Sequence, residues 1–413
     1  MTRLTWVVRG LCTPLIRWSV RRRLVTVDGV QHIPPEGAFI LAPNHSSYFD
    51  HFLTGAVLLA VRNQPAWFLT KSEAFDQPLS RFWHTVMRGL PVDRDRPSPA
   101  NLAGISQTLA AGNALVVYPE GTRGTGEGLL PFKRGAFWFA VRFGVPVVPA
   151  GIAGTSEVLP RGARWIRRRP LRIAFGPALT DDLSLPRSHR VSSLLLQAEN
   201  RIPELVAAAR TPDPDSADRL GRQVAAQIDA VLEPDGRCPA PARHRLDQMV
   251  RLIGTRRFGD LELAVQRLRL QGLRATSAGP VRRLLLGYPI RRKGRQLLRR
   301  EPSHPMTNYL LGRWYLGAPR ILGGGPEPAA AHFSRAAAHA PPEDTRYAMG
   351  LAEALIADGR AGEAVTPLTA VLTRTPENER GRARIQRATS MLSAINRPGA
   401  VNPPVRAAVG GPS

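Results

Sequence analysis

The sequence predicts an α/β domain with a mostly parallel sheet flanked by helices, followed by an all-α C-terminal region. From about residue 31 to residue 180, short apolar runs alternate with segments of helical periodicity, which is the pattern of parallel strands joined by helices. From about residue 190 the helical periodicity continues and strand patterns cease. A length of 413 residues exceeds one ordinary domain, so we expect two or more.

In the α/β region, strands are predicted where apolar runs end in turn residues, and helices where apolar residues recur every three or four positions. The predicted strands cover residues 38–42, 66–70, 90–92, 114–118, 145–152 and 171–175. The predicted helices cover residues 51–62, 79–87, 99–111 and 135–143. Ligands of such sheets bind beyond the carboxyl ends of the strands, so polar motifs directly after a strand are candidate sites.

Residues 1–24 predict an amphipathic helix that docks on a membrane surface. Arginines interrupt the apolar residues and close the segment at Arg21, Arg22 and Arg23, so it is too short and too charged to span a bilayer. It also lacks the unbroken apolar run and cleavage site of a signal peptide. A helix packed on its own domain is the alternative. The apolar face comprises Leu4, Trp6, Val7, Leu11, Leu15, Ile16 and Trp18.

The charge balance predicts a polyanionic partner. The formal net charge is +25, which suits an anionic membrane surface or a nucleic acid. No nucleic-acid-binding motif is recognisable, so no nucleic acid is expected. The two cysteines, Cys12 and Cys238, offer neither a disulfide framework nor the spacing of metal ligands.

The C-terminal half divides by composition into a basic helical region (211–300), a tetratricopeptide-like helical region (301–395) and a disordered tail (396–413). The middle assignment rests on a repeat in which Phe333 aligns with Leu368 and Pro341 with Pro376, close to the tetratricopeptide period of about 34 residues. Such a repeat suggests a protein partner. An irregular alanine-rich bundle is the alternative.

The first motif that carries chemistry is APNHSSYFD, which contains His45 and Asp50. On a regular helix their side chains would lie roughly 140° apart, so they pair only if His45 lies in the turn before the helix and Asp50 in its first turn. Asp50 would then accept from one imidazole nitrogen, and the other would be free to take a proton from a hydroxyl. Taken alone, the pair is a weak signal. No nucleophile elbow surrounds Ser46 and Ser47.

Three further motifs follow strands. VVYPEGTRG places Glu120, Gly121, Thr122 and Arg123 in a glycine-bearing turn that suits an anion, with the arginine as a bidentate phosphate donor. Glu120 would accept from a substrate hydroxyl or orient Arg123. GLPVDRD adds Arg94 as a second phosphate donor. VPVVPAGI, with Pro149, suits the wall of an acyl pocket, although core packing explains it equally well.

Together, over residues 25–185, these motifs resemble the 1-acylglycerol-3-phosphate acyltransferase family, and we expect the acyltransferase domain to extend over residues 25–210. The resemblance implies transfer of a fatty acyl group from acyl-CoA or acyl-carrier-protein to a hydroxyl of a lysophospholipid. It implies His45 as general base, Asp50 as its partner, and no metal or cofactor. It also implies that the acceptor binds to Glu120, Gly121, Thr122, Arg123, Arg94 and, near its phosphate, Lys71.

We expect the protein to lie peripherally on the cytoplasmic face of the cell membrane, docked by the helix predicted in residues 1–24. The oxyanion of the reaction would be stabilised by backbone N–H groups near the motifs. Two other functions remain open. One is acyl transfer to a different lipid acceptor, such as a glycolipid or glycerol 3-phosphate. The other is an inactive acyltransferase-like scaffold whose repeat recruits partners.

Overall fold

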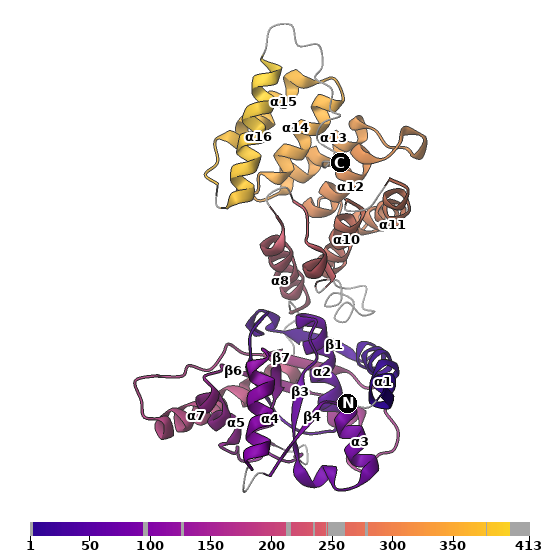
Figure 1. Cartoon of the computed structure of the whole chain (residues 1–413). Coiled ribbons are helices and arrows are strands. Elements are labelled where there is room, and N and C mark those ends of the chain that lie inside the picture. The colour runs from indigo at the N-terminus through magenta and orange to yellow at the C-terminus, as the bar shows by residue number, and fades with distance from the viewer. Residues whose placement is uncertain are drawn as a thin grey trace. The chain divides into compact units, whose positions relative to one another are not determined.

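The chain divides into two compact units (Figure 1). The N-terminal unit comprises Met1–Val224 and His244–Asp260, and the C-terminal unit comprises Ala225–Arg243 and Leu261–Ser413. The computed structural model describes residues 3–93, 98–124, 128–211, 216–233, 236–244, 246, 261–276, 280–376 and 378–396. The limits predicted for the five sequence regions stay predictions.

Within the described residues of the N-terminal unit, seven strands form one sheet in the order β1-β7-β6-β2-β5-β3-β4. All neighbouring strands are parallel except β6 and β7, which are antiparallel. The predicted fold class, a mostly parallel sheet flanked by helices, is thereby confirmed. The strands are β1 (Leu24–Asp28), β2 (Phe39–Pro43), β3 (Trp67–Lys71), β4 (Gly89–Val92), β5 (Ala114–Val116), β6 (Val147–Ala153) and β7 (Leu171–Phe175).

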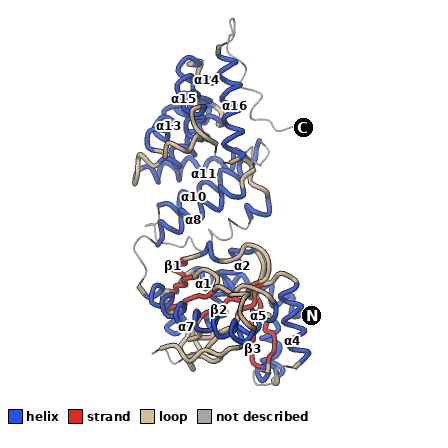
Figure 2. Tube along the Cα trace, turned by 90° about the vertical axis from the view of Figure 1, so that its left-hand side faces the viewer, coloured by secondary structure: helices blue, strands red, loops and turns tan. Residues whose placement is uncertain are grey.

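Helices cover both faces of this sheet, as the red strands between blue helices in Figure 2 show. Because side chains alternate along a strand, Ile40 and Ala42 of β2 face the core shared with α4, α5 and α7, while Phe39 and Leu41 face α2. The helices and short turns are α1 (Arg3–Arg21), η1 (Val30–His32), α2 (Phe49–Arg62), η2 (Ser72–Phe75), α3 (Pro78–Val86), α4 (Pro99–Ala110), α5 (Gly135–Phe143), α6 (Thr155–Val158) and α7 (Arg187–Arg210).

The parallel pairing brings the loops that carry the motifs to one edge. β2, β3, β4 and β5 are mutually parallel, and β6 runs parallel to β2, so the loops that follow these strands meet at the carboxyl edge of the sheet. Capping residues set where two of the flanking helices begin or end. Ser98 and Asn101 form a capping box at the start of α4, and α2 ends at Asn63, whose positive φ of 57° stops the helix.

The first helix, α1, has one face on the protein and one face in solvent. Its inner face packs on α2 and α3, where the guanidinium of Arg9 donates to the backbone oxygens of Thr85 and Val86 at the end of α3. Its outer face carries a stripe of exposed apolar side chains, among them Leu11, which is 72% exposed. Among the described residues, no helix combines the length and the apolar character needed to cross a bilayer. The stripe consists of Leu4, Val7, Leu11, Leu15 and Trp18.

The described part of the C-terminal unit is helical, as predicted, and from α12 onward each helix packs mainly against the next. Phe333 and Leu368, aligned by the sequence repeat, are both fully buried in one core. Gly312 and Gly350 lie so close to the Phe333 ring that a Cβ at either would clash with it. The tetratricopeptide assignment and its protein partner stay predictions. The helices are α8 (Ser216–Val231, shared between the units), α10 (Leu261–Thr276), α11 (Pro280–Leu298), α12 (Pro305–Gly317), η3 (Arg320–Leu322), α13 (Pro326–His339), α14 (Arg346–Ala357), α15 (Ala361–Leu372) and α16 (Glu379–Ile395).

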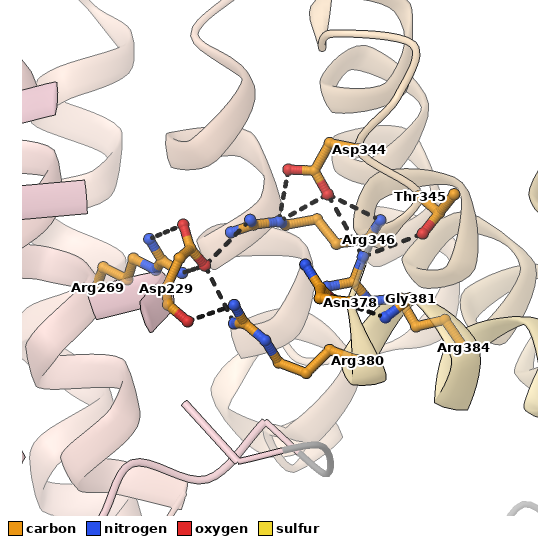
Figure 3. Close-up of polar contacts among 9 residues, drawn as sticks. All are labelled: Asp229, Arg269, Asp344, Thr345, Arg346, Asn378, Arg380, Gly381 and Arg384. Atoms are coloured by element: carbon orange, nitrogen blue, oxygen red, sulfur yellow. Dashed lines mark hydrogen bonds and ion pairs between the residues drawn. The ribbon is translucent and has the colours of Figure 1, made fainter. Parts of the chain in front are cut away.

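One carboxylate ties four of these helices together (Figure 3). Asp229 of α8 pairs with Arg269 of α10 at 2.6 Å, with Arg346 of α14 at 3.2 Å and with Arg380 of α16 at 3.3 Å. Burial favours a raised pKa for Asp229, but the hydrogen bond and charge of Arg269, with the charges of Arg346 and Arg380, outweigh it and lower the pKa to about 2. The cluster of Asp229 with Arg269, Arg346 and Arg380 therefore helps to hold α8, α10, α14 and α16 against one another.

Candidate active site

His45 and Asp50 meet as the sequence predicted. His45 lies in the turn after β2, and Asp50 lies in the first turn of α2. Nδ1 of His45 is 2.9 Å from Oδ2 of Asp50, which is fully buried. A carboxylate only accepts hydrogen bonds, so Nδ1 carries the proton and Nε2, on the other side of the ring, is left with a lone pair. The imidazole is held in the tautomer that a general base requires.

Asp50 also shapes the turn. The same Oδ2 atom accepts from the backbone N–H of Ser46 at 2.8 Å and of Ser47 at 2.9 Å. The hydroxyl of Ser47 accepts from the N–H of Phe49, the first residue of α2, at 3.1 Å. One aspartate thus orients the imidazole and fixes the loop that carries it.

Glu120 links the two motif loops. It lies in the turn after β5 and is 3% exposed. Its Oε1 accepts from the backbone N–H of His45 at 2.6 Å, and its Oε2 accepts from the N–H of Leu130 at 2.9 Å. Burial raises the pKa of Glu120, although these two hydrogen bonds act in the opposite direction. Both carboxylate oxygens therefore support the backbone of the site, and direct contact with a substrate stays a prediction.

The turn around Gly121 reinforces this link. Gly121 has a positive φ of 71°, and its N–H donates to the carbonyl of Tyr118 at 3.0 Å. The N–H of Gly124 donates to the carbonyl of His45 at 2.8 Å. The expectation that backbone N–H groups of the motifs bind an oxyanion is therefore wrong for the groups that already have acceptors. These are the N–H groups of residues 45, 46, 47, 121 and 124.

Two rings contact the imidazole. Tyr118 stacks on His45 with ring centroids 4.0 Å apart, and His51 meets it edge-on at 5.5 Å. Burial of the His51 ring, together with the smaller effects of the charges of His45, His84 and Arg123, lowers the pKa of His51 to about 3. His51 is therefore neutral at physiological pH.

Arg123 places a cation beside this pair of loops. Its guanidinium carbon lies 3.7 Å from the centroid of the exposed Tyr48 ring, in the geometry of a cation–π contact. Tyr48 immediately precedes α2, so Arg123 lies beside the turn that carries His45. Thr122, the preceding residue, is exposed. Both residues thus border the His45 turn on its solvent side.

Three predicted site residues remain. Lys71 ends β3 at the same edge of the sheet and is exposed. Pro149 is buried within β6, where its carbonyl accepts from the N–H of Gly176, and its place in the wall of an acyl pocket stays a prediction. Arg94 lies outside the described residues.

Asn44 is a positioning residue that the sequence did not reveal. Its side-chain N–H donates to the carbonyl of Ile152 at 3.1 Å, and its oxygen accepts from the N–H of Ile152 at 2.6 Å. The amide of Asn44 therefore binds the His45 turn to β6. A polar residue at the end of a buried strand was the available signal, but it did not identify the partner.

We expect the burial of His51 to make the protein sensitive to acid. The unfolded chain binds a proton at His51 near pH 6.5, whereas the folded chain does so only near pH 3. Stability is therefore lost as the pH falls from 6.5 toward 3, by about 3 kcal/mol at pH 4. His51→Phe, which keeps a ring against Phe68 and Tyr118, should reduce this loss in urea unfolding at pH 7 and pH 4. The surface variant His189→Gln should not; equal pH dependence in both would contradict the assignment.

Fold and site together define the class of protein: an α/β domain with a buried histidine–aspartate pair at the carboxyl edge of its sheet. Residues 24–153 match the family model "Acyltransferase". The match ends at the last residue of β6 and includes the His45 and Glu120 loops.

Similar proteins carry a more specific name. A Bacillus subtilis 1-acyl-sn-glycerol-3-phosphate acyltransferase is 26% identical over 183 residues, which are 44% of this chain and 87% of that protein. The human 1-acyl-sn-glycerol-3-phosphate acyltransferase alpha is 33% identical over 133 residues, 30% of this chain and 44% of that protein. A chloroplastic relative from Brassica napus is 30% identical, and the chain spans 40% of its length.

A solved structure covers a similar part of the chain. The 1-acyl-sn-glycerophosphate (LPA) acyltransferase PlsC of Thermotoga maritima matches at 23% identity and a TM-score of 0.35, over 48% of this chain and 83% of that chain.

Proposed function

We propose that this protein transfers a fatty acyl group from a thioester, acyl-CoA or acyl-carrier-protein, to a hydroxyl of 1-acylglycerol 3-phosphate in phospholipid biosynthesis. The observation that carries the proposal is the 2.9 Å hydrogen bond between His45 Nδ1 and the buried Asp50, in a turn whose backbone is bound by Glu120. The match of residues 24–153 to the Acyltransferase family model supports it, as do the names of the relatives.

The acyl group passes directly from the thioester to the acceptor, with His45 as the base. Nε2 takes the proton of the acceptor hydroxyl while that oxygen attacks the carbonyl carbon of the thioester, and Asp50 stabilises the imidazolium. When the tetrahedral intermediate collapses, the C–S bond breaks and the thiolate leaves with the proton from Nε2. His45 returns to the neutral tautomer, and no covalent acyl-enzyme forms.

Arg123 binds the phosphate of the acceptor, with Thr122, Lys71 and Arg94 as further ligands in this proposal. The guanidinium stacked on Tyr48 presents two parallel N–H donors, the geometry that a phosphate monoester accepts. Pro149 is proposed as part of the wall of the acyl pocket. Glu120, Gly121 and Asn44 hold the loops in place.

The protein acts from a membrane surface in this proposal, on the cytoplasmic face and without spanning the bilayer. The exposed stripe of α1 from Leu4 to Trp18 supports this, because five apolar side chains in solvent on one face of a helix are typical of interfacial docking. The basic residues of α1 suit anionic lipid.

The decisive experiment incubates the purified protein with radiolabelled acyl-CoA or acyl-carrier-protein and a panel of acceptors. The panel comprises 1-acylglycerol 3-phosphate, lysophosphatidylcholine, glycerol 3-phosphate and a glycolipid. Preferential labelling of 1-acylglycerol 3-phosphate supports the proposal. Labelling of another acceptor would make the protein a different lipid acyltransferase, and no transfer with any pair would leave the scaffold function.

We expect Arg123→Gln to raise the KM for 1-acylglycerol 3-phosphate by about 10- to 100-fold, because a charge-assisted contact to phosphate is lost. The KM for the thioester should stay unchanged. Arg142→Gln on α5 is the matched control, since Arg142 is an exposed arginine of the same domain away from the motif loops. Steady-state kinetics with each substrate varied in turn tests this; unchanged KM values would remove Arg123 from the phosphate site.

A further inference from the structure

The loop between α6 and β7, residues 159–170, exposes a tryptophan to an unusual degree. Trp165 is 84% exposed, and its neighbour Ile166 is 44% exposed. Large apolar side chains in such positions mark interaction sites when they occur with others of their kind. Every arginine of this loop is exposed as well, and the loop contains no acidic residue. These arginines are Arg161, Arg164, Arg167, Arg168 and Arg169.

Two backbone hydrogen bonds shape the loop. The N–H of Arg167 donates to the carbonyl of Val158 at 2.7 Å, which closes the loop at its base, and the N–H of Ala163 donates to the carbonyl of Pro160 at 3.0 Å. Trp165 and Ile166 lie in the chain between Ala163 and Arg167, inside the closed loop, and both side chains are exposed.

The loop lies beside the end of α1. The guanidinium of Arg23, two residues beyond α1, donates to the carbonyl of Arg167 at 2.9 Å, and its own carbonyl accepts from Leu171 at 2.8 Å. The neighbouring Arg22 stacks over the ring of Trp18, the last residue of the exposed stripe. The exposed stripe of α1 and the exposed pair Trp165 and Ile166 thus both lie close to the segment Arg22–Arg23 that follows α1.

The other end of the loop begins at the catalytic turn. The hydroxyl of Ser47 donates to the carbonyl of Leu159 at 2.7 Å, and the hydroxyls of Ser46 and Thr155 are 3.0 Å apart. The chain therefore runs from the neighbours of His45 to Trp165 within a few residues. A surface that receives Trp165 would lie close to the site where the acceptor binds.

We propose that the 159–170 loop is a lipid-inserting element, in which Trp165 and Ile166 enter the interface of an anionic bilayer and the arginines bind its phosphates. Tryptophan favours this interface because its ring is apolar and its N–H is polar. The five arginines are complementary to a surface of negative charge. The inference deepens the proposed function and rests on its membrane location. It adds a second point of attachment to α1, beside the active site.

The test is vesicle sedimentation of the full chain, with phosphatidylcholine vesicles that contain or lack phosphatidylglycerol. We expect the parent protein to bind the anionic vesicles, and Trp165→Ser with Ile166→Ser to lower its partition coefficient at least about tenfold. Arg164→Gln with Arg168→Gln and Arg169→Gln should reduce the dependence on phosphatidylglycerol. Leu11→Ser with Leu15→Ser serves as the α1 reference.

Leu183→Ser is the matched control. Leu183 is also a loop residue of the N-terminal unit and is 75% exposed, but it follows Asp181 and Asp182, which an anionic surface repels. Its replacement should leave partition unchanged. The proposal is overturned if the Trp165/Ile166 variant binds as the parent does, if Leu183→Ser weakens binding equally, or if the parent binds neither kind of vesicle.

A second measurement reads insertion directly. In a background of Cys12→Ser and Cys238→Ala that retains vesicle binding, a cysteine introduced at position 165 carries an environment-sensitive fluorophore. Its emission should shift to the blue on anionic vesicles, whereas the same label at position 183 should not shift. An unchanged emission at position 165 overturns insertion even if the charge variants weaken binding.

Two activity assays separate this inference from the proposed function. With a short-chain acceptor dissolved below its micelle concentration, the Trp165/Ile166 variant should transfer acyl groups at the parental rate. With acceptor embedded in vesicles, its rate should fall in proportion to its binding. If the parent transfers no acyl group in either assay, the proposed function fails, while the vesicle measurements still decide the role of the loop.

Discussion

We expect His45→Gln to lower kcat for acyl transfer by about 10²- to 10⁴-fold, the usual contribution of a positioned general base. Glutamine fills much of the same space but accepts no proton at neutral pH, so the acceptor hydroxyl would have to attack without a base. The variant tests the chemistry because the Asp50 hydrogen bonds to Ser46 and Ser47 remain. The rate is measured at saturating thioester and acceptor.

The control for this prediction is His189→Gln on α7, an exposed histidine of the same unit. It should keep the parental rate, and His45→Gln should keep the parental circular dichroism and vesicle binding. Full activity of His45→Gln would show that the imidazole is not the base. A loss of vesicle binding together with activity would indicate instead that the substitution disrupts the fold.

The positions of the strands and helices in the N-terminal unit followed closely from local sequence patterns. All six predicted strands and all four predicted helices lie within a few residues of β2, β3, β4, β5, β6, β7, α2, α3, α4 and α5. Gly135–Phe143 and Leu171–Phe175 agree at both ends. Apolar runs that end at glycine or proline indicate locally where a strand or helix begins and ends. β1 was missed, and nothing in β7 indicated that it runs antiparallel to β6, because strand direction depends on partners distant in sequence.

The His45–Asp50 pair was predictable because a turn before a helix leaves only one way for the two side chains to meet. The role of Glu120 was not predictable. One of its oxygens accepts from the backbone N–H of His45, which is distant in sequence, and the other accepts from the N–H of Leu130, which lies in an irregular loop. The contacts of Asn44 with Ile152 and of Tyr118 with the imidazole were not predictable either, because they also join residues that are distant in sequence. Residue type and spacing identify the reacting groups, whereas the residues that position them emerge only from the fold.

In the C-terminal unit, we expect Asp229→Asn to have the largest effect on stability. The folded pKa of about 2 lies below the ordinary value of 3.8, so the ionised carboxylate stabilises the fold above pH 3.8, and this stabilisation is lost as the pH falls toward 2. The difference corresponds to about 2 kcal/mol at pH 7. The amide removes the charge that Arg269, Arg346 and Arg380 share, and leaves their mutual repulsion uncompensated.

Hydrogen exchange followed by mass spectrometry locates this effect. Peptides from α10, α14 and α16 should exchange faster in Asp229→Asn, because their arginines lose a common partner, while peptides from the strands of the N-terminal unit should be unchanged. Glu233→Gln is the matched control, since Glu233 pairs with Arg237 only at 3.9 Å and in solvent, where an ion pair contributes little. If both variants exchanged alike, the Asp229 cluster would be a set of surface ion pairs. Faster exchange in the three helices would instead show that one partly buried carboxylate couples segments far apart in the chain, which no repeat or helical periodicity in the sequence predicts.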